Sequence, residues 1–195
     1  MRQSISYLFL VSTVISLFIW SCGSQATSSR DEAEVMVQNG FEIWLTDTLS
    51  IGNDRFAITA MKRTDEDSLM WDGEDEIPRP LFILKEGEPG IFKTLVRNDS
   101  VVMCGSCGGV FGDPVDNIVA EEGSFTVYHM GGSRFRWTRN IKFEYRSASA
   151  SWHLVSDRGV GFDSLDPEGD LDQLSYTPGD SLGNITFENF NVNNY

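Results

Sequence analysis

Histidine and cysteine are scarce in this chain. Only two histidines, His129 and His153, and three cysteines, Cys22, Cys104 and Cys107, occur among its 195 residues. The sequence contains no HExxH motif, which marks many zinc proteases. No grouping of serine, histidine and aspartate stands out as a catalytic set. The sequence therefore identifies no catalytic residue and favours a protein that is not an enzyme.

Basic residues are scarce as well. The chain has 15 Lys and Arg against 29 Asp and Glu, which gives a formal charge of −14. A surface of this sign repels phosphate backbones, so nucleic acids are excluded as partners. The glycine-rich stretch 105–114 lacks the lysine of a nucleotide-binding phosphate loop, and no cofactor is expected.

Long apolar runs are absent except at the start of the chain. There, an apolar run covers residues 7–20, shorter than the roughly 20 residues needed to span a bilayer. It is typical of an export signal. The following Ser21-Cys22 resembles a bacterial lipobox, in which the cysteine becomes the lipidated first residue of the mature protein. A plain signal peptide with an incidental cysteine is the alternative.

These features predict three regions: a lipoprotein signal peptide at 1–21, a lipidated Cys22 with a flexible tether at 22–34, and one domain at 35–195. Removal of the signal peptide takes away Arg2 and changes the formal charge from −14 to −15. No basic patch is then available to bind anionic lipids. The lipid must supply the anchor, and the predicted location is the bacterial cell envelope, either periplasmic or surface-exposed.

Helical patterns are rare, and the domain is expected to be all-β. Only 29–41 could hold a short capped helix. Elsewhere, short runs rich in β-branched and aromatic residues alternate with turn signals. We expect a single antiparallel sandwich or strongly curled sheet of about eight or nine strands. The predicted strands are 41–51, 55–62, 80–85, 91–98, 100–103, 124–130, 134–146, 151–157 and 184–190.

Two acidic segments interrupt the predicted strands, at 63–80 and 163–181. We interpret both as solvated loops. Clustered carboxylates with glycine can also bind calcium, but neither segment has the spacing of an EF-hand loop, so calcium binding stays open as the alternative.

The segment MCGSCGGVFGDP, residues 103–114, holds two of the cysteines. An exported chain meets oxidising conditions, so Cys104 and Cys107 are expected to form a disulfide that orders the loop. Glycines and a proline follow, which disfavours the helix of a redox-active CxxC motif. Two further alternatives are free thiols and a zinc site built from Cys104, Cys107, His129 and His153.

Three arginines fall within six residues of the predicted strand 134–146. Side chains alternate along a strand, so Arg134 and Arg136 share one face, and Trp137 lies on the other. Arginine and tryptophan are enriched at binding hot spots. The arginines could instead pair with Asp113 or with another acidic loop, and the tryptophan could cover the core. The candidate binding residues are Asp113, His129, Arg134, Arg136 and Trp137.

Four segments together resemble an uncharacterised family of exported bacterial proteins and lipoproteins. They are RPLFIL (79–84), CGGVFGDP (107–114), YHMGGSRFRWTRNIKFEY (128–145) and WHLV (152–155), and the resemblance covers roughly residues 55–160. It implies a β fold and export, and no reaction. Relatives often carry an aspartate-rich, calcium-type segment, but the corresponding LSIGNDRFAI of this chain has lost those carboxylates.

The sequence therefore predicts a lipid-anchored binding or structural module with an unknown protein or glycan ligand. One alternative is an inhibitor of a basic envelope-attacking enzyme such as lysozyme, because an acidic protein attracts a cationic partner. Another is a hydrolase or metal-dependent enzyme on the same β scaffold.

Overall fold

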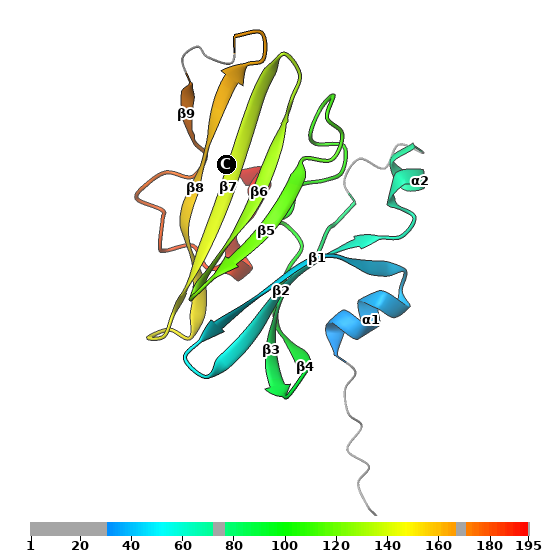
Figure 1. Ribbon diagram of the computed structural model, residues 1–195, viewed down its shortest axis with the longest axis vertical. Helices are drawn as coiled ribbons and strands as arrows, with labels where there is room; N and C mark the ends of the chain where they lie inside the picture. Colours follow the sequence, from blue (N-terminus) through cyan, green and yellow to red (C-terminus); the bar gives the residue numbers. More distant parts are fainter. Residues whose placement is uncertain (1–30, 72–76, 167–170, 195) are drawn as a thin grey trace, which may run out of the picture.

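The computed structural model describes residues 31–71, 77–166 and 171–194, which form two antiparallel sheets (Figure 1). The all-β prediction is confirmed. The first sheet has the order β1-β2-β3-β4 and the second the order β5-β6-β7-β8-β9. The strands are β1 Phe41–Ile51, β2 Asp54–Arg63, β3 Leu81–Glu88, β4 Ile91–Asn98, β5 Val115–Glu121, β6 Ser124–Gly132, β7 Phe135–Arg146, β8 Ser151–Asp163 and β9 Asp172–Ser175.

Local turns explain the strand order. Both sheets follow the order of the chain, and most neighbouring strands are joined by connections of two to four residues that sterically favour antiparallel hairpins. Gly52, Gly90 and Gly123 take positive φ in three of these turns, a conformation that favours glycine. The turn signals of the sequence thus correspond to real hairpins.

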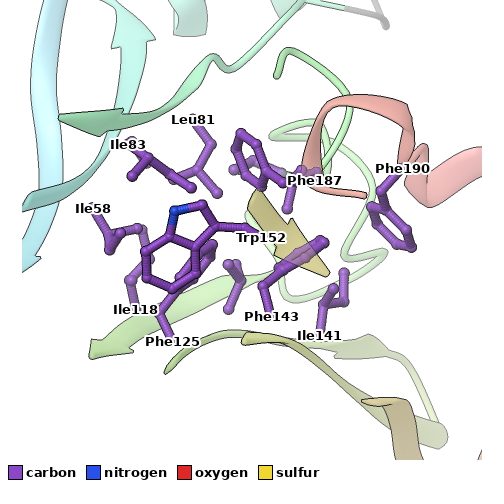
Figure 2. Close-up of a cluster of buried hydrophobic side chains, with 14 of the residues drawn as sticks. Ile58, Leu81, Ile83, Ile118, Phe125, Ile141, Phe143, Trp152, Phe187 and Phe190 are labelled. Atoms are coloured by element: carbon purple, nitrogen blue, oxygen red, sulfur yellow. The ribbon is translucent and has the colours of Figure 1, made fainter. Parts of the chain in front are cut away.

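The core lies between the two sheets, with Trp152 of β8 near its centre (Figure 2). The Trp152 ring centroid is 5.9 Å from that of Phe56 in the first sheet and 5.3 Å from those of Phe125 and Tyr145 in its own sheet. Edge-to-face and tilted ring pairs of this kind add to the free energy gained by burial. Other buried members labelled in Figure 2 are Ile58, Leu81, Ile83, Ile118, Ile141, Phe143, Phe187 and Phe190.

A short helix, α1 Glu32–Gln38, packs on the first sheet. Its N-cap Asp31 accepts hydrogen bonds from the backbone N–H of Ala33 and from the N–H and hydroxyl of Thr94 in β4. Burial opposes the charge of Asp31, but the Thr94 and Ala33 bonds outweigh it and lower the carboxyl pKa. The helix begins at Glu32, so residues 32–34 of the predicted tether 22–34 are helical.

Two predicted strands are wrong and two strands were missed. Residues 100–103 are a loop with buried Val101 and Val102, and residues 184–190 contain a 3₁₀ turn, η1 Phe187–Asn189. Strand β5 was missed because a register shift between Val115 and Asn117 breaks its alternation. Strand β9 was missed because it lies in the acidic segment 163–181 and holds one apolar residue.

The second sheet extends past the first at one end (Figure 1, top). There its inner face is covered by the loop that follows β4 and by the C-terminal segment with η2 Val192–Asn194. The loop places Met103 beside Trp137, and the Val192 carbonyl accepts a hydrogen bond from Arg139. Among the described residues, no helix has the length and apolar character needed to cross a membrane.

Candidate functional site

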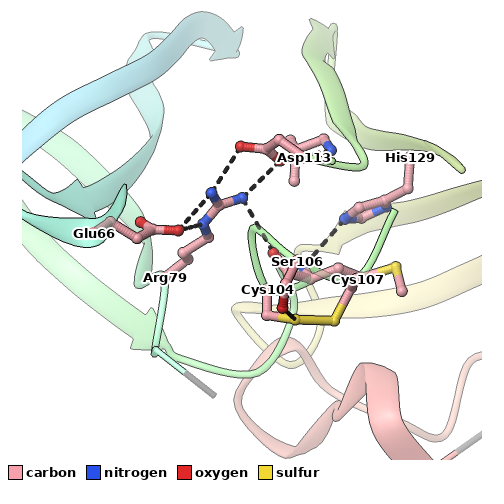
Figure 3. The surroundings of a disulfide bond; sticks show 9 residues. Glu66, Arg79, Cys104, Ser106, Cys107, Asp113 and His129 are labelled. Atoms are coloured by element: carbon pink, nitrogen blue, oxygen red, sulfur yellow. Dashed lines mark hydrogen bonds and ion pairs between the residues drawn. A yellow bond between two sulfur atoms is a disulfide. The ribbon is translucent and has the colours of Figure 1, made fainter. Parts of the chain in front are cut away.

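A buried arginine joins the loop 99–114 to the rest of the protein (Figure 3). The Arg79 guanidinium donates two hydrogen bonds of 2.7 Å to Asp113 and one of 2.7 Å from Nε to Glu66 in α2 Glu66–Trp71. Its Nη1 also donates to the Met103 carbonyl at 3.3 Å. The guanidinium carbon lies 4.7 Å from the ring centroid of Trp44 in β1. Arg79 therefore contacts three separate segments: α2, β1 and the loop 99–114.

This cluster corrects two predictions. Asp113 pairs with Arg79 and not with Arg134 or Arg136, whereas Arg134 pairs with Asp163 in the other acidic segment, in line with the second predicted partner. The acidic segment 63–80 is also not wholly solvated, because Glu66 is only 3 % exposed. Burial opposes the charge on Arg79, but the hydrogen bonds to Asp113 and Glu66 outweigh it and raise the guanidinium pKa.

The disulfide between Cys104 and Cys107 is present, as predicted. The Cys107 N–H also donates to the Cys104 carbonyl, so these four residues form a closed turn. The zinc alternative is wrong, because the sulfurs are bonded to each other. In addition, His153 lies on β8, where its ring is within hydrogen-bonding distance of Ser149, Ser151 and the Gly183 carbonyl.

Replacing Cys104 and Cys107 by serine is expected to lower the free energy of unfolding by about 1 to 3 kcal/mol. The cost lies in the lower part of the usual range because the closed loop is short and its closure removes little chain entropy. Urea unfolding of the mature protein, with and without reductant, measures it. Thiols that alkylate in the native protein without reductant would contradict the disulfide.

His129 of β6 is buried and neutral. Its Nε2 accepts a hydrogen bond from the Met103 N–H at 3.4 Å, and Nδ1 finds no hydrogen-bond partner among the described residues. Burial lowers the pKa of His129 to about 4. A side chain that holds the loop in this way and is 1 % exposed does not reach a ligand in solution.

The buried histidine predicts acid destabilisation. Because the folded pKa of about 4 lies below the unfolded value of about 6.5, the unfolded state binds the proton first. Stability should therefore fall as pH drops from about 6.5 to about 4, with a maximal slope of about 1.4 kcal/mol per pH unit. Urea unfolding across this window should show a smaller slope for His129→Gln, while His153→Gln should retain it. Equal slopes in all three proteins would contradict the assignment.

The residues of the predicted binding patch on β7 do not lie together. Arg134 is exposed and pairs with Asp163, with 2.7 Å between Nη2 and Oδ2. The Arg136 guanidinium lies over the Phe111 ring, 4.7 Å from its centroid. Trp137 lies on the inner face of the sheet. The five candidate residues therefore do not converge on one cleft.

Trp137 instead lines an apolar hollow on the inner face of the second sheet. The hollow has a volume of about 310 Å³, and its other lining residues are Met103, Leu174 and Tyr176. Gly131 in the neighbouring strand allows the indole to lie there, since a Cβ at this position would come within 2.5 Å of the ring. The GGS motif of the sequence therefore shapes the hollow.

Exposed apolar side chains surround this end of the second sheet. Eleven large apolar residues of the described chain are exposed, and six of them lie in the loop before β5, in β6 and β7 close to the turn that joins them, and in the β8–β9 connection. The loop and the turn are joined by a bridge between Gly109 and Gly132. We call these six residues the apolar rim: Val110, Phe111, Met130, Phe135, Leu165 and Leu171.

A buried ion pair contacts Tyr176, one of the residues that line the hollow. Arg139 donates two hydrogen bonds of 2.8 Å to Asp157, and its guanidinium carbon lies 4.4 Å from the centroid of the Tyr176 ring. The Thr177 hydroxyl also donates to Asp157. These contacts fix Tyr176, so the wall of the hollow is preorganised.

Sequence reasoning missed Arg79, Arg139 and two hollow residues, Leu174 on β9 and Tyr176 directly after it. An available signal for Arg79 was its position between two prolines directly before a buried strand. The segment 179–183, GDSLG, has the GxSxG spacing, but it lies in a turn and not between a strand and a helix. No side-chain hydrogen bond of Ser181 is found among the described residues.

The described residues contain no group of three or more His, Cys, Asp or Glu that could hold a metal ion. This includes the described parts of both acidic segments. Comparison with models of protein families, with curated proteins and with solved structures found no match for this chain.

Proposed function

We propose that this chain is a lipid-anchored binding protein of the bacterial cell envelope, with its ligand surface at the apolar rim and hollow. The apolar hollow, together with six exposed apolar side chains at the same end of the second sheet, carries the proposal. Exposed patches of this kind are uncommon on soluble proteins unless they contact a partner. Aromatic residues such as Trp137 and Tyr176 are frequent energetic anchors of such contacts.

The start of the described chain lies away from the hollow, as the proposed tether requires. Helix α1, near the start of the described chain, lies in the lower half of Figure 1 on the right, and β9 lies near the top on the left. A lipid on Cys22 would therefore connect to the protein on the side of the first sheet, away from β9. The binding surface would face away from the membrane, where a protein or glycan partner can reach it.

The anchor is tested in a Gram-negative host. Mass spectrometry should show an acylated N-terminal Cys22, and Cys22→Ala should move the protein from the membrane to the soluble fraction. A mature N-terminus at another residue, without lipid, would contradict the proposed anchor.

The binding surface is tested by site-specific photo-crosslinking in cells. A photoreactive amino acid at Leu174 should give a discrete adduct with a partner, whereas the same group at Leu95 of β4 should not. Leu95 is a suitable control because it is half exposed and lies on the other sheet. Identical adduct patterns at both positions would contradict a specific surface at the hollow.

The charge favours a second candidate, an inhibitor of a cationic enzyme. A formal charge of −14 accelerates association with a basic partner at low ionic strength. Inhibition of lysozyme should then occur at low salt and weaken as salt is added. Full lysozyme activity at low salt with an excess of the protein would dismiss this candidate.

A further inference from the structure

A serine–histidine cluster lies at the β7–β8 turn, far from the hollow (Figure 1, lower left). The Nε2 atom of His153 is 3.0 Å from the hydroxyl oxygen of Ser149 and 3.0 Å from that of Ser151. Both distances fall within the range of a nucleophile and its general base. A short distance is not sufficient for general-base catalysis. The ring nitrogen that faces the hydroxyl must also carry no proton.

The backbone fixes the tautomer of His153. Its Nδ1 lies 2.9 Å from the carbonyl oxygen of Gly183, which can only accept a hydrogen bond. Nδ1 of the neutral ring therefore carries the proton, and Nε2 presents a lone pair toward the two hydroxyls. This is the role that the orienting group has in serine–histidine catalysis.

The hydroxyl protons identify the nucleophile. Ser151 donates to the Ser149 oxygen at 2.8 Å, so its single proton is used there. The hydroxyl of Ser149 has two acceptors within reach, Nε2 of His153 at 3.0 Å and the Arg146 carbonyl oxygen at 3.4 Å, and the shorter distance favours Nε2. Ser149 is exposed and accessible to acyl donors, whereas Ser151 is half-buried.

Two further features belong to the cluster. The guanidinium of Arg146 donates to the same Gly183 carbonyl at 2.8 Å, so a fixed positive charge lies beside the group that orients His153. Ala150, between the two serines, has φ of +49° and is the one residue other than glycine with positive φ in the described ranges. Such backbone conformations are enriched at functional sites.

We propose that Ser149 is a nucleophile activated by His153 and that it accepts acyl groups from esters. The Ser149 oxygen would bond to the ester carbonyl carbon while its proton moves to Nε2. The bond to the leaving alcohol then breaks, and Nε2 returns the proton to the alcohol oxygen. Water, activated by the same Nε2, releases the carboxylic acid and regenerates the serine. This activity is separate from the binding role proposed above.

A fluorophosphonate probe tests the nucleophile directly. The full mature protein is treated with the probe and digested with trypsin, which releases the peptide 147–158 by cleavage after Arg146 and Arg158. The expected result is a phosphonyl adduct on Ser149, absent from Ser149→Ala. His153→Gln should react at least about a hundredfold more slowly, because it removes the general base.

Two control variants test whether labelling requires activation of the serine by His153 and does not follow from exposure of a serine alone. Ser181→Ala, in the GxSxG-like turn, and Ser156→Ala, in the same tryptic peptide, should react like the wild type. Circular dichroism should show that all variants are folded. Hydrolysis of 4-nitrophenyl acetate should be lost in Ser149→Ala and His153→Gln together. An adduct on Ser151, no adduct in this peptide, or equal rates in wild type and His153→Gln would each overturn the proposal.

Discussion

Replacing Arg79 by methionine is expected to lower the free energy of unfolding by about 3 to 5 kcal/mol. Glu66 is 3 % exposed and would keep a buried charge without its guanidinium partner. The Asp113 side chain is 37 % exposed, so water can replace part of its contact. The loss also releases the Met103 carbonyl, which frees the loop before β5. Urea unfolding at pH 7, followed by tryptophan fluorescence, measures the change.

Two further variants identify the cause. Arg55→Met removes an exposed ion pair with Glu86, in which the arginine side chain is 52 % exposed, and should cost less than about 1 kcal/mol. The double variant Arg79→Met/Glu66→Gln should recover part of the loss, because it removes the unpaired charge. If Arg79→Met costs no more than Arg55→Met, the buried cluster does not hold the loop.

The strands were predictable where alternation and turn residues agreed. Strand β1, residues 41–51, and strand β4, residues 91–98, match the expected boundaries. Apolar runs report burial and not backbone geometry, so Val101 and Val102 were read as a strand although they enter the core from a loop. Strand β5 is the opposite case. Its bulge interrupts the alternation, so the sequence pattern does not reveal the strand.

The candidate site was much less predictable. Arg79 contacts Glu66 and Asp113, which lie 13 and 34 positions away, and no local pattern encodes such a pairing. The hollow combines a loop residue, a strand residue and two residues from an acidic segment. The serine–histidine cluster differs, because Ser149, Ser151 and His153 alternate along one short stretch. Only the Gly183 carbonyl, which fixes the ring, is distant in sequence.

Truncation of the central tryptophan should also have a large effect. Trp152→Ala is expected to cost about 3 to 5 kcal/mol, because it removes the side chain that contacts rings from both sheets and leaves a cavity. Trp152→Phe should cost less than Trp152→Ala. Phenylalanine keeps most of the ring contacts, and it removes the buried indole N–H, which has no hydrogen-bond partner among the described residues.

Urea unfolding of the two variants beside Phe135→Ala provides the comparison. Phe135 is aromatic but 60 % exposed, so its truncation should change the free energy of unfolding by no more than about 0.5 kcal/mol. This control separates loss of core packing from loss of any aromatic ring. A Trp152→Phe variant as unstable as Trp152→Ala would show that the indole N–H makes a favourable contact. The large cost would then come from that polar group and not from the cavity.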